Sequence, residues 1–344
     1  MQQKKIIIIS ILIFLVLTGI GMCFYGYKII FSNNISPQSE NYLYIKTGST
    51  YSQVTDLLKE KNIVIKQKTF QKVAKWKNYP QKIKSGRYAI KQGMNNNELV
   101  NMLRSGRQDA MNFTFNNIRT KEQFAGRVSE QLEMDSVELL NLLNDTDFLS
   151  SYNLHSQTAL TIFIPNTYQM WWNISTEDFV KKMYEEYKKF WTKERTQKAS
   201  EMNLSPVEVS ILASIVEEEN HRTDEQARIA GVYMNRLKKG ILLQADPTLV
   251  FAWGDFSIRR VLNYHKEIDS PYNTYKYAGL PPGIIRIPSP TCIDNVLNYE
   301  HHNYIFMCAK EDFSGYHNFA VTNSQHEANA QKYRNKLNQL KIKK

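Results

Sequence analysis

The sequence predicts an α+β protein that begins with a single transmembrane helix and continues with a small α+β module and a larger, mixed α+β domain. Three observations support this prediction. They are an uncharged apolar run from Ile6 to Tyr27, short strand patterns that alternate with capped amphipathic helices, and a hydrophobic content of 42% over 344 residues. Such a content is enough to build real cores, and the length suits an anchor plus about two domains.

The apolar run is long enough to cross a bilayer, because about 22 helical residues at roughly 1.5 Å each span roughly 33 Å. A cleavable signal has a shorter apolar region and a small-residue cleavage site, and no such site follows here. Lys4 and Lys5 precede the run, which predicts an N-terminus (1–5) in the cytoplasm. We therefore expect a single-pass helix at 6–28 and everything after Lys28 outside the cytoplasm.

A polar linker is expected at 29–41, followed by the small α+β module at 42–106. Its strands are expected at Tyr42–Ile45 and Gly86–Ile90. Because its titratable groups do not cluster, binding or spacing is its best physical use, and a folded stalk is an equal alternative. Its three helices are marked by Thr50 with Gln53 as a capping box, by Phe70, Val73 and Ala74, and by a start at Asn97 with an end at Gly106.

Residues 107–157 are interpreted as a connecting region and 158–344 as the main domain. The main domain is expected to contain a buried strand over Ile162–Tyr168 and one long helix over Thr176–Ala199, whose aromatic stripe packs into the core. Asp246 is expected to cap a helix that begins at Pro247. Further elements are expected at Asp224–Lys239 (a helix ended by Gly240), Tyr304–Ala309 and His317–Thr322 (strands), and from His326 to the end (a basic helix).

The segment Ser205–Glu219 predicts the helix around which the main domain is organised. Ser205 can cap it, Pro206 suits its first turn and Glu208 completes a capping box. An apolar face then recurs at helical spacing and ends on one of three adjacent glutamates. Burial against such a face favours the protonated form of a carboxyl group, as a general acid near neutral pH requires. The residues on this face are Leu212, Ile215, Val216 and Glu219, whereas Glu217 and Glu218 point elsewhere. The alternative is that the three glutamates simply end the helix in solvent.

Net charge and cysteine usage narrow the function classes. The formal charge of +11 is compatible with nucleic acid, anionic lipid or an acidic polymer as partner. Nucleic acid is the weakest of these, because the lysines are scattered and no nucleic-acid-binding motif occurs. Cys23, Cys292 and Cys308 form no CxxC or metal-type spacing, so we expect neither a disulfide scaffold nor a zinc site. Cys292 and Cys308 could pair in an oxidising compartment, and two buried thiols are the preferred expectation. No cofactor is expected.

A series of ordered motifs lies between Pro165 and His326. The motifs are Pro165–Tyr168, Ala213–Glu219, Val232–Leu237, Leu243–Thr248, Ser270–Tyr275, Gly279–Gly283 with Ile287–Pro288, and His317-x-Phe319. Together they resemble the membrane-bound endolytic murein transglycosylases, the YceG-like or MltG family. The N-terminal anchor and the module at 42–106, which is LysM-like in this comparison, also match that architecture. Asn166 stands where the family has Asp, and Gln325 where Glu is common.

The resemblance implies a lyase of the bacterial cell (inner) membrane that cuts the MurNAc–GlcNAc bond of nascent peptidoglycan strands, forms a 1,6-anhydro-MurNAc end and limits strand elongation. It aligns the essential glutamate with Glu219, and Glu217 is the alternative. Candidate partners are the glycan strands, the membrane, and peptidoglycan synthases or other elongation and division proteins. The proline- and tyrosine-rich loops would line a sugar cleft or form a structural wrap. Candidate substrate-binding residues are Gln244, Asp246, Tyr272, Asn273, Tyr275, Pro282 and His317.

Two other classes remain open at this level. A non-catalytic, membrane-anchored scaffold that binds the cell wall would share the same architecture with an inert cleft. A zinc-dependent wall hydrolase is disfavoured because the seven histidines show neither HExxH nor HxxEH spacing.

Overall fold

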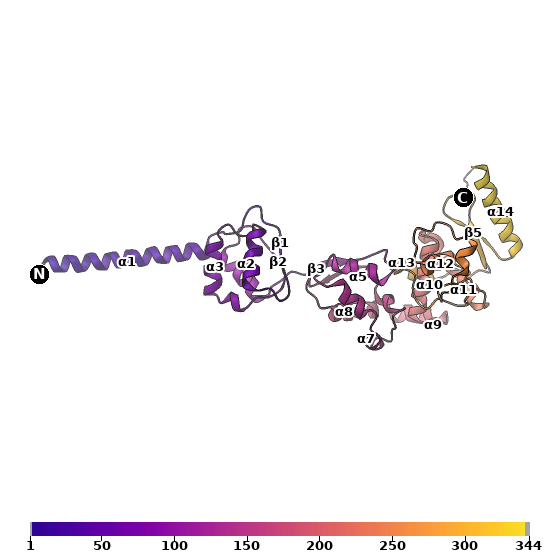
Figure 1. Cartoon of the computed structure of the whole chain (residues 1–344), viewed down its shortest axis with the longest axis horizontal. Coiled ribbons are helices and arrows are strands. Elements are labelled where there is room, and N and C mark those ends of the chain that lie inside the picture. Colours follow the sequence, from indigo (N-terminus) through magenta and orange to yellow (C-terminus); the bar gives the residue numbers. More distant parts are fainter. Residues whose placement is uncertain (1, 341–344) are drawn as a thin grey trace. The chain divides into compact units, whose positions relative to one another are not determined.

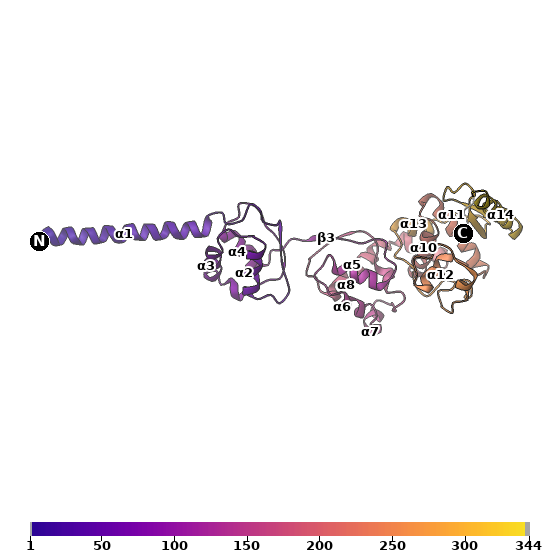
Figure 2. The ribbon, with the colours of Figure 1, turned by 45° about the horizontal axis from the view of Figure 1, so that its top comes forward.

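The computed structural model describes residues 2–340, and the chain divides into two compact units (Figures 1 and 2). Unit 1 contains the residues up to Phe113 with the short segments Gln131–Glu133 and Tyr168–Ile174, and unit 2 contains the rest. Helices and strands are mixed in the chain, as expected for an α+β protein. Within residues 2–340 the sheets are three two-stranded pairs, ordered β1–β2, β3–β4 and β5–β6.

Unit 1 begins with helix α1 (Gln2–Phe31), the only described helix that is long and apolar enough to cross a membrane. It carries no acidic residue and exposes nearly all of its apolar side chains. This agrees with the expected single membrane helix, and α1 continues three residues past Lys28.

The small module contains the two strands and three helices that the sequence predicts. Strand β1 (Tyr42–Ile45) pairs antiparallel with β2 (Gly86–Ala89). The capping box predicted at Thr50 forms. Asn95 forms another with Glu98, so α4 begins at Asn96, one residue before the expected start at Asn97. The helices of the module are α2 (Tyr51–Glu60), α3 (Gln67–Trp76), the 3-10 turn η1 (Tyr79–Gln81) and α4 (Asn96–Ser105).

The segment 29–41, expected to be a polar linker, is partly built into this module. Ile29 and Ile35 are buried in its core. Asn34 donates to the backbone carbonyl of Lys66 and to the side chain of Asn96, and the Asn96 amide donates to the carbonyl of Ile29. The expectation of a linker was therefore wrong for 29–35, because isolated apolar residues among polar ones gave no periodic signal.

Unit 2 is centred on α10 (Pro206–Glu219), whose residues from Val209 to Val216 are all buried. Helices α11 (Thr223–Lys238) and α13 (Pro290–Leu297) pack against it. The remaining helices are α5 (Lys121–Ser129), α6 (Ser136–Leu142), α7 (Thr146–Ser150), η2 (Ala159–Ile162), α8 (Thr176–Phe190), α9 (Lys193–Glu201), α12 (Asp246–Trp253), η3 (Asn263–Glu267) and α14 (Asn323–Gln339), and the strands outside the module are β3 (Met111–Thr114), β4 (Thr167–Met170), β5 (Phe306–Ala309) and β6 (His317–Ala320).

Two element predictions in this region were wrong. The long helix expected over Thr176–Ala199 is two helices, because Trp191 leaves the helical conformation and Thr192 caps α9 through the backbone N–H of Arg195. Of the buried strand expected over Ile162–Tyr168, Ile162 ends the 3-10 turn η2, residues 163–166 form no regular element, and the strand begins only at Thr167. The end of the final basic helix, at residues 341–344, lies outside the described residues.

Burial of Ile35 makes a testable prediction about the module. Ile35 is 0% exposed, whereas Ile65 is 55% exposed. Ile35→Ala should lower the free energy of unfolding by about 2–5 kcal/mol through lost burial and the cavity left behind, and Ile65→Ala should change it by less than about 0.5 kcal/mol. Limited proteolysis of the detergent-solubilised chain across a temperature series would report both. Equal resistance of the two variants to cleavage within the module would contradict the assignment of Ile35 to its core.

Candidate active site

Glu219 ends α10 and lies on the face of the helix that packs into unit 2. The Ser205 hydroxyl accepts the backbone N–H of Glu208, and the Glu208 carboxylate accepts the backbone N–H of Ser205. The predicted capping box is therefore confirmed. Near the other end, Ser214 is fully buried and accepts the backbone N–H of Ile285 at 3.1 Å. These contacts at both ends fix the rotation of α10, and therefore fix which glutamate faces inward.

The carboxyl group of Glu219 meets α11 at Tyr233. The hydroxyl of Tyr233, which is 1% exposed, donates to Oε1 of Glu219 at 2.6 Å. Burial raises the pKa of Glu219 to about 7, against the opposing effect of this hydrogen bond, and the charge of Asp246 adds to the increase while that of Arg236 opposes it. A group with this pKa exchanges a proton readily near neutral pH.

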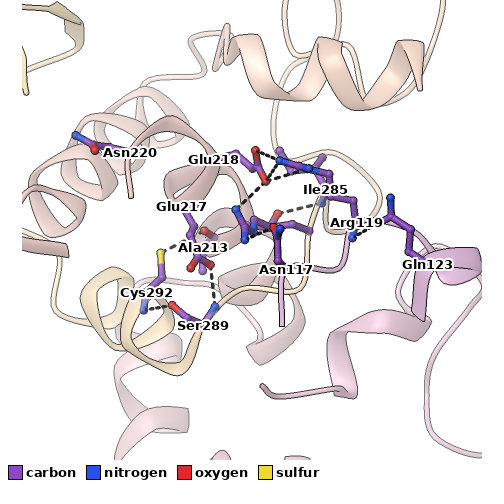
Figure 3. Close-up of polar contacts among 12 residues, drawn as sticks. Asn117, Arg119, Gln123, Ala213, Glu217, Glu218, Asn220, Ile285, Ser289 and Cys292 are labelled. Atoms are coloured by element: carbon purple, nitrogen blue, oxygen red, sulfur yellow. Dashed lines mark hydrogen bonds and ion pairs between the residues drawn. The ribbon is translucent and has the colours of Figure 1, made fainter. Parts of the chain in front are cut away.

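The two neighbouring glutamates leave α10 in other directions and have partners of their own, as Figure 3 shows. Glu217 accepts the backbone N–H of Ser289 at 2.8 Å. Glu218 accepts both Nε and Nη2 of Arg119 and also forms an ion pair with Arg286 at 2.9 Å. The simple alternative, three glutamates in solvent at a helix end, does not describe this cluster, and Glu217 does not line the cavity described next.

Glu219 lies in the wall of an open cavity of about 270 Å³. Four of the candidate substrate-binding residues line it together with Glu219. Two follow α11 in the chain, one lies in the loop between η3 and α13, and one lies on β6. These four are Gln244, Asp246, Tyr275 and His317, and the remaining lining residues are Val232, Tyr233, Arg236, Leu243, Met307, Cys308 and Ala309.

Asp246 does not cap α12, so that prediction was wrong. The helix begins at Asp246 itself, with Ala245 in the capping position and no side-chain capping bond. The carboxylate of Asp246 instead accepts the hydroxyl of Tyr275 at 2.5 Å. The cavity therefore contains a second carboxylate, paired with a phenol.

Arg236 holds one wall of the cavity in shape. Its guanidinium is buried and donates to the backbone carbonyls of Ile305, Leu242 and Leu243. It also donates to Oε1 of Gln244, whose backbone adopts the left-handed conformation at φ +52°. Because the amide oxygen of Gln244 is already bonded, its NH₂ group is the part left to donate to a ligand.

His317 is oriented by a buried carboxylate. Glu225 of α11 is 3% exposed and accepts both the backbone N–H of His317, at 2.9 Å, and its ring Nδ1, at 2.8 Å. Asn220, directly after Glu219, donates to the same carboxylate. With Nδ1 committed in this way, Nε2 is the ring nitrogen of His317 that remains for a ligand in the cavity.

The other three candidates lie outside this cavity. Asn273 is fully buried, and its side chain donates to the backbone carbonyls of Lys266 and Ile268 and accepts the N–H of Tyr275. It therefore shapes the loop that carries Tyr275. Tyr272 packs against Phe251, and burial raises its pKa to about 12. Pro282 lines a different, more apolar hollow.

Sequence reasoning missed the three residues that support the site, namely Tyr233, Arg236 and Glu225. A signal existed for two of them, because Tyr233 and Arg236 are three residues apart on a mostly buried helix and must share a face.

Among the residues that the structure describes, no three His, Cys, Asp or Glu side chains gather as metal ligands would. Cys292 is a buried free thiol and Cys308 a half-buried one.

The raised pKa of Glu219 predicts how stability depends on pH. Between the ordinary pKa of 4.5 and about 7, the native carboxyl keeps a proton that the unfolded one has released, so the free energy of unfolding decreases as pH rises through this window. Glu219→Gln removes this loss, and it should stabilise the protein at pH 8 by up to about 3 kcal/mol and much less at pH 4.

Thermal unfolding at the two pH values would measure the difference. Glu218→Gln, at the neighbouring position, is the control. It should lower the free energy of unfolding because the buried guanidinium of Arg286 would lose its ion pair. If Glu219→Gln gave the same change at pH 4 and pH 8, the assigned burial of this carboxyl would be wrong.

Comparison with known proteins places these residues in context. Residues 43–332 match the YceG-like family. The chain is 29% identical over 310 residues to an endolytic murein transglycosylase of Bacillus subtilis, covering 84% of this chain and 83% of that protein. It is 26% identical over 374 residues to an endolytic murein transglycosylase of Streptococcus pneumoniae, covering 98% and 67%. The crystal structure of a YceG-like protein from Listeria monocytogenes has a TM-score of 0.56 at 25% identity, covering 85% of this chain and 99% of that one.

Proposed function

The chain belongs to the YceG-like family, and from this membership and the surroundings of Glu219 we propose that it is a lytic transglycosylase that cleaves peptidoglycan within its glycan strands. The proposed product is a 1,6-anhydro-MurNAc end, and the proposed consequence is a limit on strand elongation. The observation that carries the proposal is a single desolvated carboxyl group, with a pKa of about 7, in the wall of an open polar cavity.

The proposed reaction needs one group that first donates and then accepts a proton. Protonated Glu219 would donate to O4 of the departing GlcNAc as the C1–O4 bond breaks. The resulting carboxylate would then take the proton of the C6 hydroxyl of MurNAc as O6 bonds to C1. No water is consumed, and Glu219 returns to its protonated form. Hydrolytic glycosidases instead use a second carboxyl group to activate water or to attack the sugar.

The cavity offers groups that suit the charge changes of this reaction. Positive charge develops at C1 in an oxocarbenium-like transition state, and the carboxylate of Asp246 beside Tyr275 can stabilise it. The amide NH₂ of Gln244 and Nε2 of His317 are available to hydrogen-bond sugar hydroxyls or N-acetyl groups. Because each of these groups is held by a buried partner, little reorganisation is needed when substrate binds.

We further propose that α1 spans the cell membrane with the N-terminus inside and the remaining chain outside. Lys4 and Lys5 before the apolar run favour this orientation. Anchoring keeps the cavity close to newly made strands and to the synthases that extend them, at a high effective concentration.

The decisive test compares the full chain with Glu219→Gln on intact sacculi, with mass spectrometry of the released fragments. The wild type should yield anhydro-ended fragments, and the variant should yield them at least about 10³-fold more slowly, because the general acid is lost while the cavity keeps its shape. Glu217→Gln is the matched control and should retain activity. Undiminished anhydro product from Glu219→Gln would exclude Glu219, and glycan binding without any cleavage by the wild type would support a non-catalytic scaffold.

Tyr233 provides a test through the pH dependence. Activity, as kcat/KM, should fall as pH rises above about 7 because Glu219 loses its proton. The hydrogen bond from Tyr233 lowers the pKa of Glu219, so Tyr233→Phe should move this fall to higher pH. Tyr272→Phe, outside the cavity, should leave the profile unchanged. A profile that does not move in Tyr233→Phe would show that Glu219 is not the group that titrates.

A further inference from the structure

The positive charge of the chain is concentrated in the small module and the segments beside it. Residues 28–113 contain 15 Lys and Arg against 5 Asp and Glu, a net charge of +10 out of +11 for the whole chain. Residues 114–344 contain 27 against 28 and are nearly neutral. The nearly neutral catalytic half does not account for this positive charge. Its function must therefore be sought in the module itself.

The module is fixed to the end of α1 without a flexible linker. Ile29 of α1 is buried in the core of the module, and the Asn96 side chain donates to its carbonyl at 2.8 Å. Helices α3 and α4 pack against α1, and Figure 1 shows α3 beside its end. When α1 spans a membrane, this part of the module must therefore stay at the membrane surface.

With α1 placed across a membrane, Lys72 of α3 would lie at the depth of the membrane interface. The ammonium group of Lys72 lies 5.7 Å from the ring centroid of Tyr25. Tyr25 precedes Lys28 by three residues, which places it roughly 4.5 Å deeper along the helix. Lys72 therefore reaches the level where α1 enters the apolar region. On the same exposed side of α3 lie Lys68 and Trp76, and an exposed indole is typical of the lipid–water boundary.

A cavity of about 390 Å³ opens between the end of α1 and the start of α3. Its inner wall is closed by Asn34 and Asn96, whose amides bond each other and the backbone. Its mouth is formed by Tyr25, Lys28, Asn33 and Lys66. Lys28 and Lys66 both line this space, and neither forms an ion pair with any described residue, so the cavity has two cationic residues without a paired carboxylate.

We infer that this face, formed by Lys66 directly before α3, Lys72 on α3 and Lys28 on α1, binds the headgroups of anionic phospholipids, with one phosphate held in the cavity between Lys28 and Lys66. Phosphate groups at a bilayer surface match both the charge and the depth of these ammonium groups. An anionic wall polymer would match the charge alone, and it would not explain the exposed Trp76 or the contact of Lys72 with Tyr25. The inference rests on the proposed placement of α1 in a membrane and is independent of the glycan chemistry.

The test uses the full chain in neutral-detergent micelles containing equimolar phosphatidylglycerol and phosphatidylcholine, with retained lipids counted by native mass spectrometry. Wild type should retain phosphatidylglycerol in preference to phosphatidylcholine, and Lys66→Gln/Lys72→Gln should reduce this preference by about tenfold. The matched control is Lys46→Gln/Lys84→Gln, with the same loss of charge. Lys46 and Lys84 are next in sequence to Thr47 and Ser85. Thr47 donates a hydrogen bond to Glu133, and Ser85 accepts one from Asn173. The two control lysines therefore lie beside the segments 131–133 and 168–174 of unit 1. The control should keep the wild-type preference.

Equal retention of both lipids by the wild type, or an equal loss in both double variants, would overturn the inference. So would capture of the wild type by immobilised poly(glycerol phosphate) without any lipid preference, because the ligand would then be a wall polymer. Flotation with phosphatidylcholine vesicles is measured alongside, and a wild type that fails to float would refute both the placement of α1 and the lipid site. Glycan cleavage by the same preparations is a separate readout. Its absence in the wild type would contradict the proposed function and leave the lipid result standing.

Discussion

The hydrogen bond between Tyr233 and Glu219 is the interaction on which the candidate site depends. It joins the end of α10 to the middle of α11, where Tyr233 is fully buried and Glu219 is partly buried in the cavity wall. Burial alone would push the pKa of this carboxyl higher, and the phenol opposes that shift by stabilising the charged form. The packing of α10 against α11 therefore sets the acidity of the group as well as its position.

The end of α10 carries three adjacent acidic residues, where the helix dipole is unfavourable to negative charge. The structure compensates two of these residues separately. Glu218 meets two arginines and Glu217 meets a backbone N–H at the start of α13. Glu219 is left without a cationic partner in direct contact, so desolvation dominates its behaviour. The neighbours thus hold the helix end in place, and only one carboxyl is left for chemistry.

The sequence was most informative where a few adjacent residues decide the structure. The capping boxes of α2 and α10, the end of α11 at Gly240 and the inward-facing position of Glu219 all follow from local rules. It was least informative where the partner is distant in the chain. Asp246 is a residue type that often caps helices and it precedes a proline, yet its carboxylate accepts the hydroxyl of Tyr275, 29 residues away. Asn273 looked available to substrate, but its own loop uses its whole side chain.

A group that must donate a proton and then accept one in a single catalytic cycle is best served by a pKa close to the working pH. A carboxyl in water, near 4.5, would be a weak proton donor because almost none of it is protonated at neutral pH. A carboxyl buried without any opposing hydrogen bond would have a still higher pKa, and it would release its proton less readily because its charged form is more unfavourable. The balance of burial against one phenolic hydrogen bond places Glu219 between these limits. A lone carboxyl can therefore serve both steps, and Asp246 needs no role in proton transfer and is left to stabilise positive charge.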